Sequence, residues 1–179
     1  MAGIFPKTGK NKVQKLEKVV FEYFLNELNL RRSQGKKKSP YLIGILLNEA
    51  NGANLSIIQS LMAYLEKEQL RIQILHPGYI SGGISYDEAT YHQINEPKEL
   101  GITQEFDIIM LIHPYWKEQH ISFGLLQACD WNLLMIDAEV VWKPNYSKFV
   151  DMIQSSTGLK PDMLLSNVDS IFVKEYTGA

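Results

Sequence analysis

Short, nearly uniform apolar runs alternate along this chain with segments in which apolar residues recur every three or four positions. The first pattern is typical of strands buried on both faces of a parallel sheet, and the second predicts amphipathic helices. The predicted strands are 41–47, 71–75, 107–112, 131–136 and 162–165. The predicted helices are 12–30, 55–68, 121–129 and 145–155. This alternation predicts an α/β fold, a three-layer sandwich with a mostly parallel sheet, preceded by an amphipathic amino-terminal helix.

The first 40 residues differ in pattern from the rest. The apolar positions of the first predicted helix are Leu16, Val19, Val20, Tyr23, Phe24 and Leu28. Residues 31–40 are polar, contain Gly35 and Pro40, and predict a connector. We therefore divide the chain into a basic helix and connector, 1–40, and an α/β domain, 41–179. The apolar face of the helix either packs on the domain's own sheet or contacts another subunit.

Two further segments carry weaker patterns. Residues 79–101 contain Gly, Ser, Asn and Pro throughout and predict a long loop with a short helix. The residues after 165 predict an exposed tail.

The amino-acid composition is typical of a globular protein and not of a membrane-spanning or disulfide-bonded one. A hydrophobic content of 45% and a charged content of 21% in 179 residues are typical of a soluble globular chain with one core. No apolar run approaches the roughly 20 residues that a membrane-spanning helix requires, and no signal-peptide pattern is present. The single Cys129 excludes an intramolecular disulfide, and its apolar surroundings predict a small buried side chain rather than a nucleophile.

Charge is distributed unevenly along the chain. Residues 1–40 carry ten Lys or Arg against three Glu, whereas the remaining residues carry eight against seventeen acidic residues. The basic segment therefore predicts an anionic partner, either a membrane surface, a nucleic acid or an acidic protein surface. The alternative is a solvated helix face followed by a flexible lysine-rich loop, which composition alone favours.

The stretch from residue 44 to residue 56 lies where a phosphate-binding loop would lie, between a buried strand and a helix. A working loop follows the pattern G-x-x-x-x-G-K-[ST], in which Lys reaches the phosphates and Ser or Thr holds Mg²⁺. Here Asn54 stands at the Lys position and Leu55 at the Ser/Thr position. The setting predicts a P-loop NTPase-like fold, but an amide supplies no positive charge and Leu ligates no metal. The positions of this degenerate nucleotide site are Asn48, Asn51, Gly52, Ala53, Asn54, Leu55 and Ser56.

Two further candidate positions follow predicted strands, His76 and His113, each directly before a proline. Ligands of parallel sheets bind beyond the carboxyl ends of the strands, where Asp137 also lies. Two imidazoles could share a metal or contact an anion, but a metal site needs three or four ligands. We therefore predict no metal site, and we interpret these histidines as hydrogen-bonded structural residues.

Together these segments resemble the cytoplasmic domain of bacterial polysaccharide co-polymerases, the chain-length determinant proteins fused to a bacterial tyrosine kinase (BY-kinase) domain. The family loop GITSPSPGEGKSTI lies without gaps on residues 44–57. Residues 3–6 are similar to the segment that follows the second transmembrane helix in that family, which implies a longer membrane protein. Residues 128–136 and 158–168 are similar to its last strands.

The departures from that family all fall on chemical positions. Where active members carry a Walker-type Asp after the second strand, this chain has His76, and at the Walker B Asp it has His113. A tyrosine cluster ends the family's chains, whereas here Tyr176 is the only tyrosine near the end. Phosphoryl transfer depends on Mg²⁺ and on cationic groups at the phosphates, so we expect no catalytic residues and no cofactor.

The resemblance therefore implies a pseudokinase that assembles or regulates an envelope exopolysaccharide export complex at the cytoplasmic face of the bacterial inner membrane. Its expected partners are further copies of itself, export or polymerase subunits, and the membrane surface next to the basic segment. One alternative is an enzyme that binds a nucleotide or phosphosugar with Asn54, Ser56, His76 and His113. A nucleic-acid binder is the other alternative, and the acidic remainder argues against it.

Overall fold

The structure is a computed structural model that describes residues 2–6, 10–35, 40–47, 52–76, 84–85, 105–113, 123–138, 144–158 and 160–168. Within these residues a seven-stranded sheet has the order β1-β7-β6-β2-β5-β3-β4, and every neighbouring pair is parallel. The strands are β1 (Ala2–Pro6), β2 (Tyr41–Leu47), β3 (Ile72–His76), β4 (Ile84–Ser85), β5 (Ile108–His113), β6 (Trp131–Asp137) and β7 (Asp162–Val168). The fold is thus the expected α/β sandwich, and the parallel sheet is confirmed.

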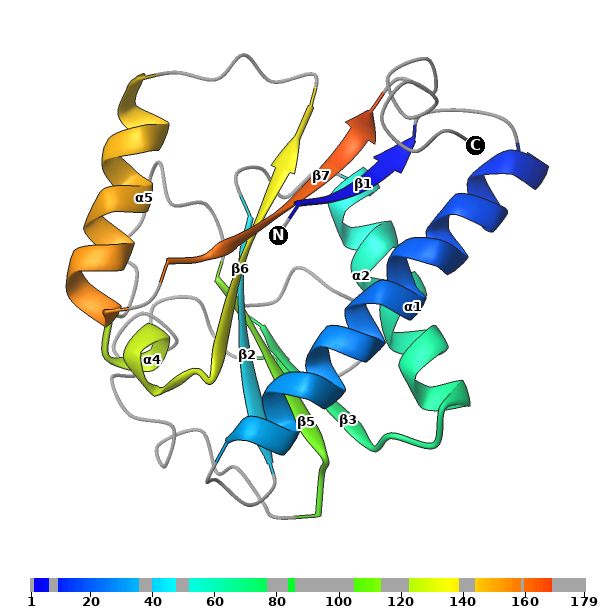
Figure 1. Ribbon diagram of the computed structural model, residues 1–179, viewed down its shortest axis with the longest axis horizontal. Helices are drawn as coiled ribbons and strands as arrows, with labels where there is room; N and C mark the ends of the chain where they lie inside the picture. Colours follow the sequence, from blue (N-terminus) through cyan, green and yellow to red (C-terminus); the bar gives the residue numbers. More distant parts are fainter. Residues whose placement is uncertain are drawn as a thin grey trace.

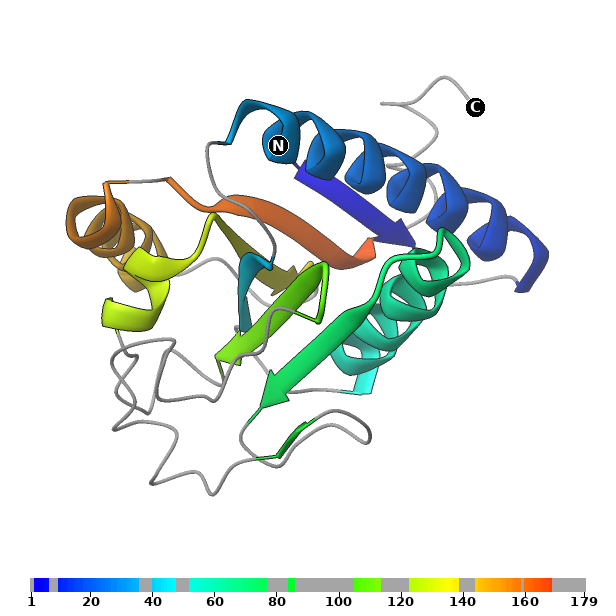
Figure 2. The ribbon, with the colours of Figure 1, turned by 90° about the horizontal axis from the view of Figure 1, so that it is seen from below.

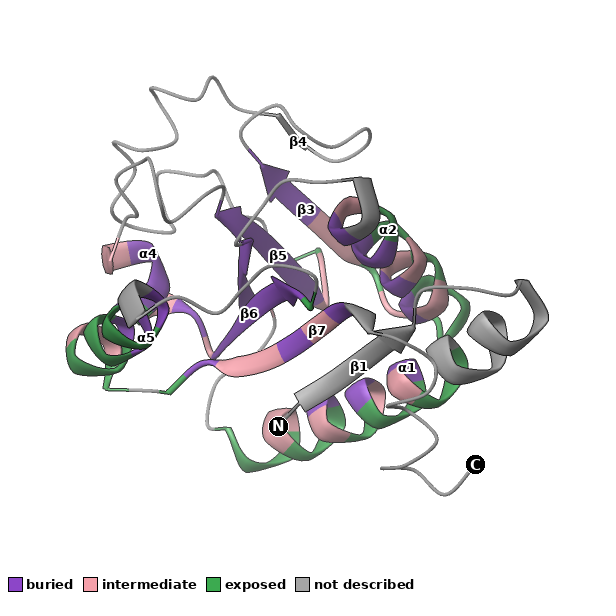
Figure 3. Ribbon diagram, turned by 90° about the horizontal axis from the view of Figure 1, so that it is seen from above, coloured by how far each residue is buried: buried purple, intermediate pink, exposed green. Residues whose placement is uncertain are grey.

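Helices cover both faces of this sheet (Figures 1 and 2). The described helices are α1 (Lys10–Gln34), α2 (Gly52–Lys67), α4 (Phe123–Ala128) and α5 (Pro144–Thr157). Side chains of α1 and α2 share one core cluster with alternate residues of the central strands. Side chains of α4 and α5 pack with the residues in between, on the other face. The central strands are therefore buried on both sides, as Figure 3 shows, which explains their uniformly apolar sequence.

The first helix packs on the domain's own sheet. Phe21, Phe24 and Leu28 are buried in the core cluster that α1 shares with α2. The predicted apolar face was partly wrong, because Val19 and Tyr23 are each 54% exposed. The helix also extends through residues 31–34, which were predicted as connector. No described helix combines the length and the apolar character needed to cross a membrane.

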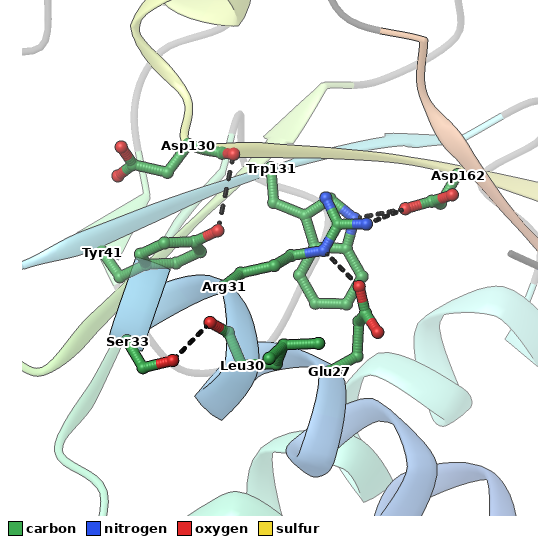
Figure 4. A network of polar contacts seen from close by, with 8 residues as sticks. All are labelled: Glu27, Leu30, Arg31, Ser33, Tyr41, Asp130, Trp131 and Asp162. Atoms are coloured by element: carbon green, nitrogen blue, oxygen red, sulfur yellow. Dashed lines mark hydrogen bonds and ion pairs between the residues drawn. The ribbon is translucent and has the colours of Figure 1, made fainter. Parts of the chain in front are cut away.

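Arginine at the end of α1 explains this extension. The Arg31 guanidinium lies 4.7 Å from the centre of the Trp131 ring, on which Phe24 also stacks. Its Nη2 donates to Asp162 Oδ2 at 3.0 Å, and its Nε donates to Glu27 Oε1 at 2.8 Å (Figure 4). Trp131 Nε1 donates to the same Asp162 oxygen at 2.8 Å. We call Glu27, Arg31, Trp131 and Asp162 the α1 anchor.

Tyr41 lies beside this anchor at the start of β2. Its hydroxyl donates to the Asp130 carbonyl oxygen at 3.4 Å (Figure 4). Burial, together with the nearby Asp130 carboxylate, raises the pKa of Tyr41 to about 12, so the phenol stays neutral at physiological pH.

The edges of the sheet differ most from the predictions. β1 was not predicted as a strand, yet it pairs with β7 in parallel register. β7 runs to Val168, three residues beyond the predicted end, and the two-residue strand β4 lies within the predicted loop at 79–101. Single-residue shifts at β3 and β5 place His76 and His113 inside the strands rather than after them. The predicted short helix and the tail after residue 168 lie outside the described residues.

Near the middle of the sheet, one glycine makes room for a polar side chain. Gly44 on β2 pairs in register with Asn132 on β6. Asn132 Nδ2 donates to the Leu126 carbonyl oxygen at 3.0 Å and so caps the end of α4. A methyl group at Gly44 would overlap Asn132 Oδ1 and would lie 3.1 Å from Cys129 Sγ. Gly44 is therefore required by packing against Asn132.

This close approach predicts a coupled pair of substitutions. We expect Gly44→Ala to lower the free energy of unfolding by about 1–3 kcal/mol, because an added methyl overpacks a filled core. Asn132→Ala removes the side-chain amide and so makes space for the methyl group that Gly44→Ala adds. The double variant should therefore be more stable than the sum of the two single losses predicts. Urea unfolding of all four proteins measures this coupling, and additive losses would contradict it.

Candidate functional site

The candidate site lies at the carboxyl edge of the sheet, where α2 begins. β2 ends at Leu47, and α2 begins at Gly52. Asn48 and Asn51 lie outside the described residues. Ala53 lies in the first turn of α2, and the structure describes no side chain before Asn54 in this helix.

Asn54 points into the protein rather than toward solvent. Its side chain is fully buried, and so is that of Ser166 on β7. Ser166 Oγ donates to Asn54 Oδ1 at 2.6 Å and also lies 3.3 Å from the Ile136 carbonyl oxygen on β6. We call this arrangement of Asn54, Ser166 and the Ile136 carbonyl the α2–β7 contact. The position that would hold the phosphate-binding lysine is therefore occupied by a neutral amide with an internal partner.

The next two residues of α2 have different surroundings. Leu55 is half-buried and packs against the core cluster shared by α1 and α2. Ser56 is exposed. Leu55 thus contributes apolar contact where a working loop would place a metal-binding hydroxyl, and the one hydroxyl of this turn lies one residue further on.

The two candidate histidines end neighbouring strands but lie on opposite faces of the sheet. Both are buried, His76 on β3 and His113 on β5. His113 pairs in register with Leu46, which packs with α4 and α5. The register of β3 and β5 places His76 beside Ile112, which packs with α1 and α2. Since paired residues of parallel strands share a face, this arrangement does not bring the two imidazoles together at one ligand.

Among the described residues at this edge, Asp137 is a further titratable side chain beside the two histidines. It is 5% exposed and pairs in register with Ser166. Within the part of the chain that the structure describes, no group of three or more His, Cys, Asp and Glu is placed to hold a metal ion. The hydrogen bonds of Ser166 join three elements at this edge, α2, β6 and β7.

Ser166 is the residue that sequence reasoning missed. The predicted last strand ended at 165, one residue short of it, because polar residues interrupt the apolar run. Residues 162–168 do not alternate polar with apolar positions, so the two-residue period of a strand gives no local signal for Ser166. Extending the strand beyond residue 165 would have placed Ser166 on the same face as Asp162 and Leu164, which α1 and α2 cover.

Comparison with known proteins identifies the fold. The kinase domain of the Escherichia coli tyrosine kinase ETK matches with a TM-score of 0.62 at 9% sequence identity, over 88% of this chain and 76% of that domain. At that identity the likeness concerns the fold alone. The chain has a P-loop NTPase-like α/β fold of the kind found in a bacterial tyrosine kinase domain.

Two other solved structures match less well. A GTPase from Pyrococcus abyssi, in its apo form, has a TM-score of 0.42 at 15% identity, over 69% of this chain and 66% of its own. A possible uridine kinase from Bacillus stearothermophilus has a TM-score of 0.38 at 14% identity, over 76% of this chain and 95% of its own. No family model and no curated protein sequence matches the chain.

Proposed function

We propose that this chain is a pseudokinase, a non-catalytic domain with a bacterial tyrosine kinase fold. In this proposal it acts in the assembly or regulation of an envelope exopolysaccharide export complex at the cytoplasmic face of the inner membrane. The observation that carries the proposal is the burial of Asn54 against Ser166 at the position of the phosphate-binding lysine. The packing of Leu55 at the metal-ligand position supports it.

The residues at positions 54 and 55 matter because phosphoryl transfer needs a cation and a metal ligand there. Catalysis of phosphoryl transfer is almost entirely positioning and electrostatic stabilisation of the phosphates by a cation and by Mg²⁺. A buried amide supplies no charge, and an aliphatic side chain supplies no ligand. His113 at the Walker B position supplies an imidazole rather than the carboxylate that Mg²⁺ prefers.

Nucleotide titration tests the proposal directly. We expect no binding heat from ATP or ADP, with or without Mg²⁺, in isothermal titration at a protein concentration near 100 μM, which detects affinities in the micromolar range or tighter. The ETK kinase domain, titrated under the same conditions, is the positive control. Binding by this chain that is lost in His113→Ala would overturn the proposal and favour the enzyme with a non-standard site.

The basic amino-terminal segment supports a membrane surface as one partner. Each Lys or Arg close to an anionic bilayer contributes about 1 kcal/mol of attraction. Residues 41–179, which follow this segment, are strongly acidic. The electrostatic attraction to an anionic membrane is therefore confined to the amino-terminal segment. In this proposal the segment lies against the inner membrane while the acidic domain faces away from it.

Vesicle binding tests this partner. Replacing Lys36, Lys37 and Lys38 by Gln should weaken cosedimentation with vesicles rich in phosphatidylserine by up to about 100-fold, which corresponds to about 3 kcal/mol. A matched variant replaces three exposed lysines of the acidic part, Lys67, Lys148 and Lys160, and should bind as the wild type does. Equal loss in both variants, or equal binding to neutral vesicles, would contradict the proposal.

Self-association is the other proposed interaction, and the outer side of α1 supports it. Val19, Tyr23 and Leu30 are each at least half exposed. Their spacing of four and seven residues places them on one side of the helix, opposite Phe21, Phe24 and Leu28 in the core. This side of α1 offers three large apolar side chains to a second copy.

Sedimentation equilibrium tests the self-association. We expect the wild type to associate with increasing concentration and the triple variant Val19→Ser, Tyr23→Ser, Leu30→Ser to stay monomeric, because the apolar contact is removed. Met152 on α5 is 43% exposed on the other face of the sheet, so Met152→Ser is the matched control and should associate normally. A wild type that is monomeric up to about 100 μM, a concentration at which micromolar association is detectable, would contradict this interaction.

A further inference from the structure

β7 contacts both helices that cover one face of the sheet. Its side chains at positions 162, 164 and 166 lie on that face, because alternate residues of a strand share a face. Asp162 accepts from Arg31 of α1, Leu164 lies in the core cluster of α1 and α2, and Ser166 donates to Asn54 of α2. One strand thus binds α1 through a half-buried ion pair and α2 through a fully buried hydrogen bond.

The contact with α2 falls at a position where many proteins of this fold depend on a ligand. In a working phosphate loop the first turn of the helix surrounds a bound phosphate, which is a partner from outside the protein. Here the polar side chain in that turn has its partner inside the protein, 112 residues away in the sequence. The β7 backbone continues this link, since Ala138 N donates to the Ser166 carbonyl oxygen at 2.8 Å.

We infer that the α2–β7 contact fixes the amino end of α2 in a single, ligand-independent position. This end of the helix is then a fixed structural element and not a switch that responds to nucleotide. The inference rests on the proposed pseudokinase function and adds to it that nucleotide does not change the conformation of this site. Because the α2–β7 contact needs no ligand, the positions of α2 and of the strands beside it stay the same whether or not nucleotide is present.

The physical basis is the cost of an unsatisfied polar group in a sealed environment. Both side chains of the contact are fully buried, so water cannot replace either partner if the bond is lost. Breaking the contact therefore exposes the amino end of α2 to local opening, whereas the intact contact suppresses it. Ser166 also lies within reach of the Ile136 carbonyl, so rotation of its hydroxyl leaves it with an alternative acceptor on β6 but leaves Asn54 without this donor.

Amide hydrogen exchange of residues 52–60 measures this opening. In the wild type we expect the amides from residue 55 on, which have acceptors within the helix, to be protected without ligand. We expect exchange throughout 52–60 to be unchanged by 5 mM ATP with Mg²⁺ or by inorganic phosphate. In Ser166→Ala we expect exchange there to be about 10- to 100-fold faster, as for the loss of one buried hydrogen bond. Exchange in β5, residues 108–113, should change far less, which separates local opening from general destabilisation.

Two control variants complete the experiment. Ser155→Ala removes an exposed hydroxyl that bonds within its own helix, and it should leave residues 52–60 unchanged. Ser166→Cys keeps nearly the same shape with a weaker donor, so it should fold even where Ser166→Ala does not, and its exchange should be intermediate.

The outcomes distinguish this inference from the proposed function. Unchanged exchange at 52–60 in both Ser166 variants, with no nucleotide binding by the wild type, overturns the inference and leaves the pseudokinase proposal standing. Slower exchange of the wild type on adding ATP, together with binding heat, overturns both. Restored protection of Ser166→Ala by phosphate alone also overturns the inference, because the turn would then still be a ligand site.

Discussion

Burial of the parallel sheet on both faces is the constraint on which the rest of this structure depends. A polar side chain on a central strand cannot reach water, so it must find a partner within the protein. The Asn132 amide nitrogen meets this condition by donating to the Leu126 carbonyl oxygen at the end of α4, and Gly44 provides the space for the side chain. Ser166 meets it by donating to Asn54. Asp162, at the start of β7, is 17% exposed and accepts from Arg31 and Trp131. The contacts of Ser166 with Asn54 and of Asp162 with Arg31 join elements that lie far apart in the sequence, so these polar groups also fix how the layers are arranged.

The same constraint links the changes at the phosphate loop to one another. An ammonium group at position 54 would lie in the enclosed space between α2, β6 and β7, where burial of an unpaired charge is costly. A neutral amide that accepts from Ser166 avoids that cost. Leu55 in place of a hydroxyl adds apolar contact with the neighbouring core. The substitutions that remove phosphate-binding chemistry, in the proposed function, are therefore also the substitutions that complete the packing around the start of α2.

How much of this could be predicted from the sequence depended on whether a pattern was local. β2, β5 and β6 are nearly uniform apolar runs, and α2 repeats apolar residues at helical spacing, so their types and approximate bounds followed from the sequence. β1 was missed because Ala2–Pro6 is short, and its pairing with β7 joins the two ends of the chain. The burial of Asn54 could not be predicted from the sequence either, because it depends on Ser166, which lies beyond the end of the predicted strand. Phe21 was missed, and Val19 and Tyr23 misplaced, because a helix with apolar residues on two sides gives an ambiguous periodicity.

The two polar contacts of β7 differ in a way that separates their roles. The α1 anchor is charged and lies near the surface, where Arg31 is 34% exposed, so solvent and salt moderate its strength. The cation–π contact of Arg31 with Trp131 and the stacking of Phe24 add components that salt screens less. The α2–β7 contact is neutral and fully enclosed, so it is insensitive to ionic strength and unavailable to outside ligands. A partner that binds the outer side of α1 therefore meets a helix whose position is set by the sheet and by these contacts. In the proposed function that makes this domain a fixed surface for assembly, and any regulation of the complex has to come from changes in which partners are bound.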